Sequence, residues 1–336
     1  MKTTIHILTL LIVVVAVGGC SENRDNSTYR DAEGAAWNTT YHVTYRSEKV
    51  LDDSIIAVMR TVELSLSPFC KTSIISRINR NENARPDSQL IEVFNTSLMV
   101  NKLSGGMFDP TVGPLVSLWG FGEAGHDTSQ PTAAMIDSAL QSVGIGRCQL
   151  TDTGIAKPSQ ATRFNFSAIT KGFGCDMVGK MLRRNGCNDY MVEIGGEIAL
   201  SGHNRRGEPW RIMVDAPVAN DSTVDHQRMA VIALTDCGVA TSGNYRNFRH
   251  TANGTVGHTI SPMTGRPVAT STLSATVVAP TAMLADALAT ACMAMNPDSA
   301  LAIADKLTDT RIMLVSMKDN GEWLIRTSKQ FPEISR

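Results

Sequence analysis

The chain has 336 residues and a formal net charge of −1, with 31 Lys and Arg against 32 Asp and Glu. It contains no run of five or six like charges, which argues against a basic nucleic-acid-binding surface and against a disordered acidic chain. Roughly 315 residues follow an N-terminal targeting segment, enough to bury a sizeable core without metal or disulfide staples.

A lipoprotein signal peptide is predicted over residues 1–19. After the basic Lys2, the apolar stretch 5–17 is too short to span a membrane but suits a signal peptide. Val17–Cys20 then resembles a lipobox, in which the Cys20 thiol takes the lipid; a secretory signal with a chance cysteine is the alternative. We expect a lipidated polar tether over 20–35 and a folded domain over 36–336. The protein would be exported and anchored to a bacterial membrane, inner or outer, facing the periplasm.

Strands and helices are predicted in an irregular order. Alternating or β-branched runs predict strands, and apolar positions at helical spacing predict helices. In chain order these are a strand at 39–45, helices at 51–66, 89–103, 132–143 and 171–185, strands at 189–194, 210–214, 229–234 and 272–278, a helix at 281–295, and a hairpin of 311–316 with 323–326. Because no regular βαβ rhythm occurs, we expect an α+β fold with mixed sheets and packed helices.

A rigid loop is predicted at Gly106–Leu115, where two prolines and two glycines exclude a helix or central strand. Phe108 could stack on a flat ligand, and Asp109 could accept hydrogen bonds from a heterocycle. A purely structural connector is the alternative.

An anion site is predicted at Asn165–Gly174, where an extended segment turns into a helix. The free N–H groups of the helix start and the Lys171 ammonium would attract an anion, and Gly172 and Gly174 would allow close approach. Glycines that serve only packing are the alternative.

Two further segments have the composition of ligand-binding turns. Glu193–Glu197 contains paired glycines at a strand end, which suits either close approach of a bulky ligand or a β-bulge. His258 precedes a turn fixed by proline and glycine, which makes it a candidate general base or an ordinary surface histidine.

The predicted helix around Met283–Met293 is apolar all round, with Asp286 as its one charge. A buried carboxylate must meet a cation or strong donors. Thr290 lies four residues later on the same helix face, and two oxygen groups so placed suit a hard cation such as Mg²⁺. A buried ion pair is the alternative.

Taken in order, these segments resemble the ApbE family of FAD:protein FMN transferases from about Ala36 to Met295. The motifs that carry the resemblance are Gly-x-Phe-Asp-Pro-Thr-Val-Gly-Pro-Leu-Val from Gly106, Lys171-Gly172-Phe173 with Asp176, Val192–Glu197, Ala240–Tyr245, His258–Pro267 and Ala285–Thr290. The resemblance implies a T-fold-like architecture and Mg²⁺-dependent transfer of the FMN half of FAD to a Ser or Thr hydroxyl, with release of AMP.

The resemblance also implies roles for individual residues. His258 and Asp286 would be catalytic. A magnesium ion would be held by the backbone of Ala168, by Asp286, by Thr290 and by Ala289. FAD would contact Trp37, Phe69, Met107, Phe108, Asp109, Asn165, Lys171, His258 and Ile260.

The chain departs from the family pattern at Trp37-Asn38-Thr39, where Met-Gly-Thr is frequent, at Asn165, where aspartate is frequent, and at Thr259 and Ser261. The implied partners are exported flavoproteins of electron-transfer complexes with a Ser/Thr flavinylation motif, and no nucleic acid is expected. Two alternatives stay open: an Mg²⁺-dependent FAD pyrophosphatase, which yields FMN and AMP, and a lipoprotein that only binds FAD.

Overall fold

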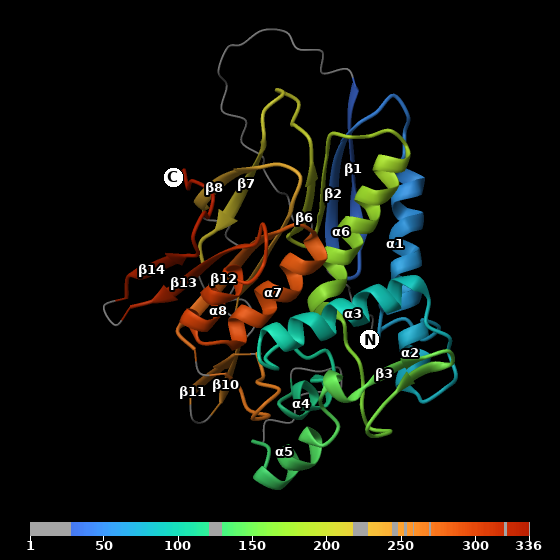
Figure 1. Cartoon of the computed structure of the whole chain (residues 1–336), viewed down its shortest axis with the longest axis vertical. Helices are drawn as coiled ribbons and strands as arrows, with labels where there is room; N and C mark the ends of the chain where they lie inside the picture. The colour runs from blue at the N-terminus through green and yellow to red at the C-terminus, as the bar shows by residue number, and fades with distance from the viewer. Residues whose placement is uncertain are drawn as a thin grey trace, which may run out of the picture.

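The structure is a computed structural model that describes residues 28–120, 130–217, 228–243, 248–251, 254–257, 259–268, 270–318 and 321–335. At its centre is an eight-stranded antiparallel sheet (Figure 1), ordered β1 (Tyr29–Ala36), β2 (Thr39–Arg46), β5 (Tyr190–Ile194), β6 (Glu197–Ser201), β9 (Gly238–Gly243), β12 (Thr272–Ala279), β13 (Arg311–Met317) and β14 (Trp323–Thr327). Three two-stranded ribbons accompany it: β3 (Gln149–Thr151) with β4 (Gly154–Ala156), β7 (Trp210–Asp215) with β8 (Arg228–Leu234), and β10 (Phe248–Thr251) with β11 (Gly254–Gly257).

The helices in the described part are α1 (Asp52–Leu66), α2 (Ile74–Asn79), α3 (Ser88–Leu103), α4 (Gly113–Leu118), α5 (Ala133–Leu140), α6 (Ser167–Arg184), α7 (Ala282–Ala294) and α8 (Pro297–Ala304). Helices α6 and α7 pack on one face of the sheet, and α1 lies beside α6 (Figure 1). Helices and antiparallel strands are thus combined without parallel βαβ units in the described residues, and the α+β class is confirmed.

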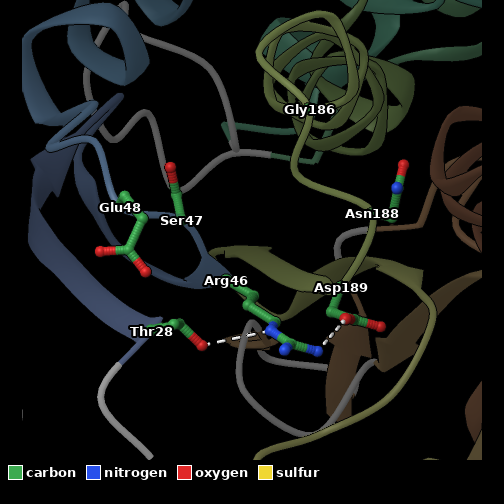
Figure 2. A pocket seen from close by; sticks show the side chains of 7 residues that line it. All are labelled: Thr28, Arg46, Ser47, Glu48, Gly186, Asn188 and Asp189. Atoms are coloured by element: carbon green, nitrogen blue, oxygen red, sulfur yellow. Dashed lines mark hydrogen bonds and ion pairs between the residues drawn. The ribbon is translucent and has the colours of Figure 1, made fainter.

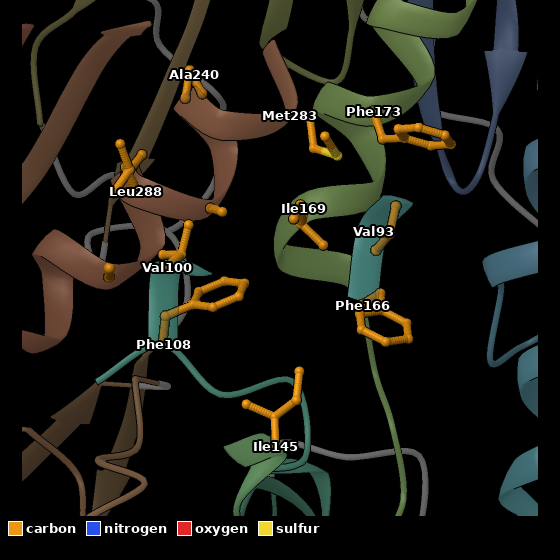
Figure 3. Close-up of a cluster of buried hydrophobic side chains, with 14 of the residues drawn as sticks. Val93, Val100, Phe108, Ile145, Phe166, Ile169, Phe173, Ala240, Met283 and Leu288 are labelled. Carbon is orange, nitrogen blue, oxygen red and sulfur yellow. The ribbon is translucent and has the colours of Figure 1, made fainter. Parts of the chain in front are cut away.

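The main core joins α3, α6 and α7 to the sheet. Figure 3 shows part of it, including Val93 of α3, Ile169 of α6 and Leu288 of α7. Helix α7 is buried along nearly its whole length because it is enclosed by α6, α3 and strands β9 and β12. This explains why its sequence is apolar all round rather than amphipathic.

The β7–β8 ribbon covers the opposite face of the sheet. Trp210 and Ile232 of the ribbon share a core cluster with Val278 of β12, whereas the neighbouring Val277 belongs to the core under α7. Strand β12 is therefore buried on both faces, which is why its sequence is a continuous β-branched and small-residue run.

The N-terminal boundary differs from the predicted one. Residues 29–36 form strand β1, which pairs with the whole of β2 from Tyr29↔Arg46 to Ala36↔Thr39. The predicted tether over 20–35 is therefore wrong for residues 29–35. Its Ala- and Gly-containing composition does not specify a strand by itself; backbone pairing with β2 and burial of Ala32 hold it in place. Cys20 lies outside the described residues.

Within the described part of the chain, no helix combines the length and the apolar character needed to cross a bilayer.

Helices α6 and α7 come closest at Gly172. A Cβ atom at this position would lie 2.2 Å from the carbonyl oxygen of Ala282 and 2.9 Å from Cβ of Asp286. The helix crossing thus requires a residue without a side chain at this point of α6.

We predict that Gly172→Ala lowers the free energy of unfolding by about 2 kcal/mol, because the added methyl group forces two backbones apart in a packed interior. Chemical denaturation monitored by circular dichroism measures the loss. Gly146→Ala is the control, since a Cβ atom at Gly146 would lie 4.0 Å from its nearest neighbour, Oδ1 of Asn101. Equal stabilities of the two variants would contradict the close crossing.

Candidate active site

A buried charged cluster lies where the start of α6, the start of β6 and the middle of α7 meet. The Nζ atom of Lys171 lies 2.6 Å from Oε1 of Glu197. The backbone N–H of Gly172 donates to Oδ2 of Asp286 over 3.0 Å. Glu197 and Asp286 are almost fully buried, and Oε2 of Glu197 has no hydrogen-bond partner in the described part of the chain. The cluster therefore contains two carboxylates and one ammonium group.

The pKa values of the three groups depend on one another. Burial raises the pKa of Asp286, while the Lys171 charge and the Gly172 N–H act against that rise. Burial and the nearby charge of Asp286 raise the pKa of Glu197. Burial alone would lower the pKa of Lys171, but the two carboxylates outweigh it and raise that pKa above its usual range. Lys171 is therefore charged at neutral pH, and its single positive charge faces two carboxyl groups whose pKa values are raised.

The Gly195-Gly196 pair is the two-residue turn of the β5–β6 hairpin, neither a bulge nor an open loop. Both glycines have positive φ values, +62° and +97°, as a type I′ turn requires. The N–H of Gly195 donates to the Thr40 carbonyl over 3.0 Å. A Cβ on Gly195 would lie 3.2 Å from Cδ of Lys171, so the turn closes directly over the lysine stem.

Trp37 lies in the neighbouring turn, between β1 and β2. Trp37 and Asn38 both have positive φ values, +51° and +62°, the backbone conformation of a second two-residue turn. The Trp37 indole covers Gly174 of α6, where a Cβ would come within 2.4 Å of the ring. Trp37 and Lys171 are thus brought to the same end of the sheet.

Oxygen atoms gather near Asp286. The hydroxyl of Thr290, one turn later on α7, lies 3.3 Å from the hydroxyl of Ser242 on β9. In an α-helix the N–H of Gly172 points at the carbonyl of Ala168, so this carbonyl lies beside the Asp286 carboxylate that shares the same N–H. Ala289 is buried within α7. In the described residues no three His, Cys, Asp or Glu side chains converge, so a cation here would depend on hydroxyl and carbonyl oxygens as well.

The loop at 106–115 is held by its own side chains. The Asp109 carboxylate accepts hydrogen bonds from the Thr111 N–H at 2.8 Å, the Thr111 hydroxyl at 2.6 Å and the Ile145 N–H at 3.0 Å. Burial raises the pKa of Asp109, while these hydrogen bonds oppose the rise. The Phe108 ring is buried in the main core (Figure 3). Both side chains thus make structural contacts within the fold, and their contact with FAD stays a prediction. Met107 is half-buried against the same core.

The remaining predicted site residues differ in how closely they lie to the charged cluster. The N–H of Asn165 donates to the Pro110 carbonyl over 2.7 Å, and its side-chain oxygen accepts from the N–H of Ser167 at the start of α6. Ile260 is buried with Leu115. Phe69 is 64% exposed, and no hydrogen bond or ring contact among the described residues connects it to the charged cluster. His258 lies outside the described residues.

Three residues near the cluster belong to the predicted motifs but were given no individual role. Glu197 follows the glycine pair, and a buried acid opposite Lys171 could have been suspected from that position. The hydroxyl of Ser242 carries no sequence signal beyond its motif. Asp176, one turn after Gly172, accepts hydrogen bonds from Met283 and Ala282; burial raises its pKa to about 6, against the effect of these bonds.

A separate cavity of about 360 Å³ lies at the opposite end of the sheet (Figure 2). It is lined by Thr28, Arg46, Ser47, Glu48, Gly186, Asn188 and Asp189. Arg46 is satisfied there by Thr28 at 3.1 Å and Asp189 at 3.5 Å. None of the predicted site residues contributes to this cavity, so its size does not make it the active site.

The buried lysine–carboxylate cluster, the glycine-rich start of α6 and the oxygen groups on α7 have the donor types that suit an anionic group together with a hard cation. The sequence pattern of the ApbE family matches residues 37–314. The chain therefore belongs to the ApbE family, and the predicted resemblance is confirmed.

Known relatives match nearly the whole chain. The FAD:protein FMN transferase of Haemophilus influenzae is 32% identical over 352 residues, covering 100% of this chain and 99% of the relative. That of Vibrio cholerae is 32% identical over 321 residues, covering 93% and 94%. The structure of flavin transferase ApbE from Vibrio cholerae superposes with a TM-score of 0.79 at 32% identity, covering 90% of this chain and 98% of that chain. The apo flavinyl transferase ApbE of Pseudomonas stutzeri gives 0.78 at 26% identity, covering 90% and 95%.

We predict that Lys171→Met destabilises the fold by about 2 kcal/mol at neutral pH, because two buried carboxylates lose their counter-charge. The pKa values of Glu197 and Asp286 are already raised with Lys171 present, so the unmodified chain also loses stability as the pH rises above the unfolded-state value of about 4. Loss of Lys171 raises both pKa values further. The deficit of the variant therefore grows with pH once the pH exceeds the folded-state pKa values of the unmodified chain.

Urea denaturation between pH 4.5 and 8 measures this effect. Lys318→Met is the matched control, since Lys318 forms an exposed pair with Glu322 at 3.1 Å, and such pairs contribute at most about 1 kcal/mol. A deficit for Lys171→Met that does not change with pH would contradict the assignment.

Proposed function

We propose that this chain is an FAD:protein FMN transferase, which moves the FMN half of FAD to a Thr or Ser hydroxyl of an acceptor flavoprotein and releases AMP. The observation that carries the proposal is the full-length match to relatives of that name. The arrangement of Lys171, Asp286 and the start of α6 supports it, because a pyrophosphate substrate needs these groups. We further propose that the reaction depends on Mg²⁺.

The residues fit a magnesium ion by charge and by donor type. Two carboxyl groups, those of Asp286 and Glu197, face the single ammonium group of Lys171, and Oε2 of Glu197 is buried without a hydrogen-bond partner among the described residues. The carboxylate of Asp286, the hydroxyl of Thr290 and the carbonyls of Ala168 and Ala289 would hold the ion. These hard oxygen donors match the preference of Mg²⁺. When bound, the ion would neutralise charge on the pyrophosphate during transfer.

The chain's own groups would bind and orient the dinucleotide. The first turn of α6 would offer its positive dipole end to the pyrophosphate. The N–H groups of Ser167, Ile169 and Thr170 in that turn already have acceptors, so the attraction would come from the dipole and from Lys171. Lys171, held by Glu197, adds a fixed positive charge beside it. Trp37 on Gly174 provides an aromatic surface for the flavin, and the buried α6–α7 crossing keeps water from this side of the site.

Removal of the acceptor hydroxyl's proton is assigned to His258, which follows β11 directly in the sequence. An imidazole titrates near neutral pH and can act as a general base there. If water reached this position instead, the site would release free FMN and AMP. Pyrophosphatase activity is therefore the chemically adjacent alternative, and simple FAD binding is the third.

The location and partners of the enzyme are also proposals. Cys20 would carry a lipid, so the domain would work at a bacterial membrane on its periplasmic side. The acceptors would be exported flavoproteins of electron-transfer complexes, with the hydroxyl in an Asp-x-x-(Ser/Thr)-Gly-Ala type motif.

The proposal is tested with the full chain purified in detergent. It is incubated with FAD, Mg²⁺ and a small protein carrying an Asp-x-x-Thr-Gly-Ala-Thr motif, and the intact mass of the acceptor is measured. We expect a gain of one FMN, abolished by EDTA. AMP release without a mass gain would instead identify a pyrophosphatase, and FAD binding with neither signal would identify a carrier.

We predict that Asp286→Ala abolishes transfer at any Mg²⁺ concentration, because the remaining oxygens cannot hold the ion without a carboxylate. The acceptor mass assay and AMP release measure the effect. Asp298→Ala is the control, since it removes an exposed carboxylate from the neighbouring helix α8. Transfer by Asp286→Ala at the rate of the control would refute the metal assignment.

A further inference from the structure

The position of α7 along α6 decides where the proposed metal-binding groups lie. Asp286 and Thr290 both project from α7, while Ala168 and Lys171 belong to α6. A shift of one helix along the other would separate these two halves of the site. Some contact between the helices must therefore fix their relative position.

Asp176 of α6 makes such a contact with the first two residues of α7. Its Oδ1 accepts the N–H of Ala282 and its Oδ2 accepts the N–H of Met283, each over 2.9 Å. The first N–H groups of a helix have no partner within the helix. The next N–H, of Leu284, is taken by the hydroxyl of Thr281 at 3.2 Å. The N–H groups at the start of α7 that lack a partner within the helix thus all have side-chain acceptors. The Asp176 carboxylate of α6 accepts from two of them.

The opposite contact lies one helical turn away. Asp286 of α7 accepts the N–H of Gly172 of α6. Residues 172 and 176 on α6 thus face residues 286 and 282 on α7, so the helices run antiparallel. Each helix gives one carboxylate to the backbone of the other. Two such contacts, four residues apart on each helix, resist both sliding and rotation.

The packing around Ala282 leaves no room for another register. A Cβ at Gly172 would lie 2.2 Å from the Ala282 carbonyl oxygen, and a Cβ at Gly238 of β9 would lie 2.1 Å from the Ala282 nitrogen. The start of α7 is enclosed between α6 and the sheet. Its two hydrogen bonds to Asp176 are therefore made in one geometry.

We infer that Asp176 is a positioning residue for the metal-binding site: it sets the register of α7 on α6 and thereby places Asp286 and Thr290. Asp176 does not itself touch the substrate or the metal. The inference rests on the proposed function, because it assumes that Asp286 holds a divalent cation.

The test compares Asp176→Asn with the unmodified full chain. An asparagine side chain presents an NH₂ group to one of the two N–H donors, so one of the two contacts is lost and the register loosens. Mn²⁺ binding is measured by electron paramagnetic resonance without FAD, and the Mg²⁺ dependence of transfer is measured separately. We expect the half-saturating metal concentration to rise about tenfold or more, as for other residues that orient metal ligands, while the rate at saturating Mg²⁺ changes little.

Thr281→Ala is the matched control. It removes the other side chain that caps α7, so it destabilises the same helix start, but it leaves both contacts of Asp176 intact. We expect a lower melting temperature for this variant with unchanged Mn²⁺ affinity. A purely structural role of Asp176 predicts the same behaviour for both variants, and that result would overturn the inference.

If Asp176→Asn does not fold, Asp176→Glu takes its place. It keeps both carboxylate oxygens but moves them by one methylene, so weaker Mn²⁺ binding in a folded chain supports the inference and unchanged binding refutes it. Absence of Mn²⁺ binding and of transfer in the unmodified chain would instead refute the proposed function.

Discussion

Asp286 is 2% exposed on a helix that has no other charged residue, so its charge must be offset inside the protein. The structure does this with one backbone N–H and one nearby ammonium group, and it then adds the second carboxylate of Glu197. The start of α6, the glycine turn of β5–β6 and the tight crossing at Gly172 all serve to bring these groups together. Much of the order of this fold can be traced to the cost of burying that carboxylate.

The periodicity of apolar residues in the sequence predicts several helices and strands well. Helix α3 begins within one residue of its predicted position, and so do β7, β8 and β13. Strands β1, β6 and β9 were not predicted, because they are short or rich in Ala, Gly and Ser. β1 is stabilised by its hairpin with the neighbouring β2, whereas β6 and β9 pair with each other, and β9 with β12, across long stretches of sequence that no local pattern records. The antiparallel order of the sheet is a property of these pairings.

The site residues could be predicted from the sequence where they lie on the same helix. Asp286 and Thr290 could be paired from their spacing on an apolar helix alone. The directions of Phe108 and Asp109 could not, because loop composition does not tell whether a side chain faces a ligand or the core. Asp176 has no sequence signal for its role, since its partners are backbone N–H groups more than a hundred residues away.

The pairing of β1 with β2 has a consequence for where the charged cluster lies. The chain enters the fold at Tyr29, paired with Arg46, whereas Trp37 and the charged cluster lie at the other end of the same hairpin. Eight residues of strand correspond to roughly 26 Å. The N-terminal end of β1 and the end that carries Trp37 and the charged cluster are therefore separated by about the length of one strand.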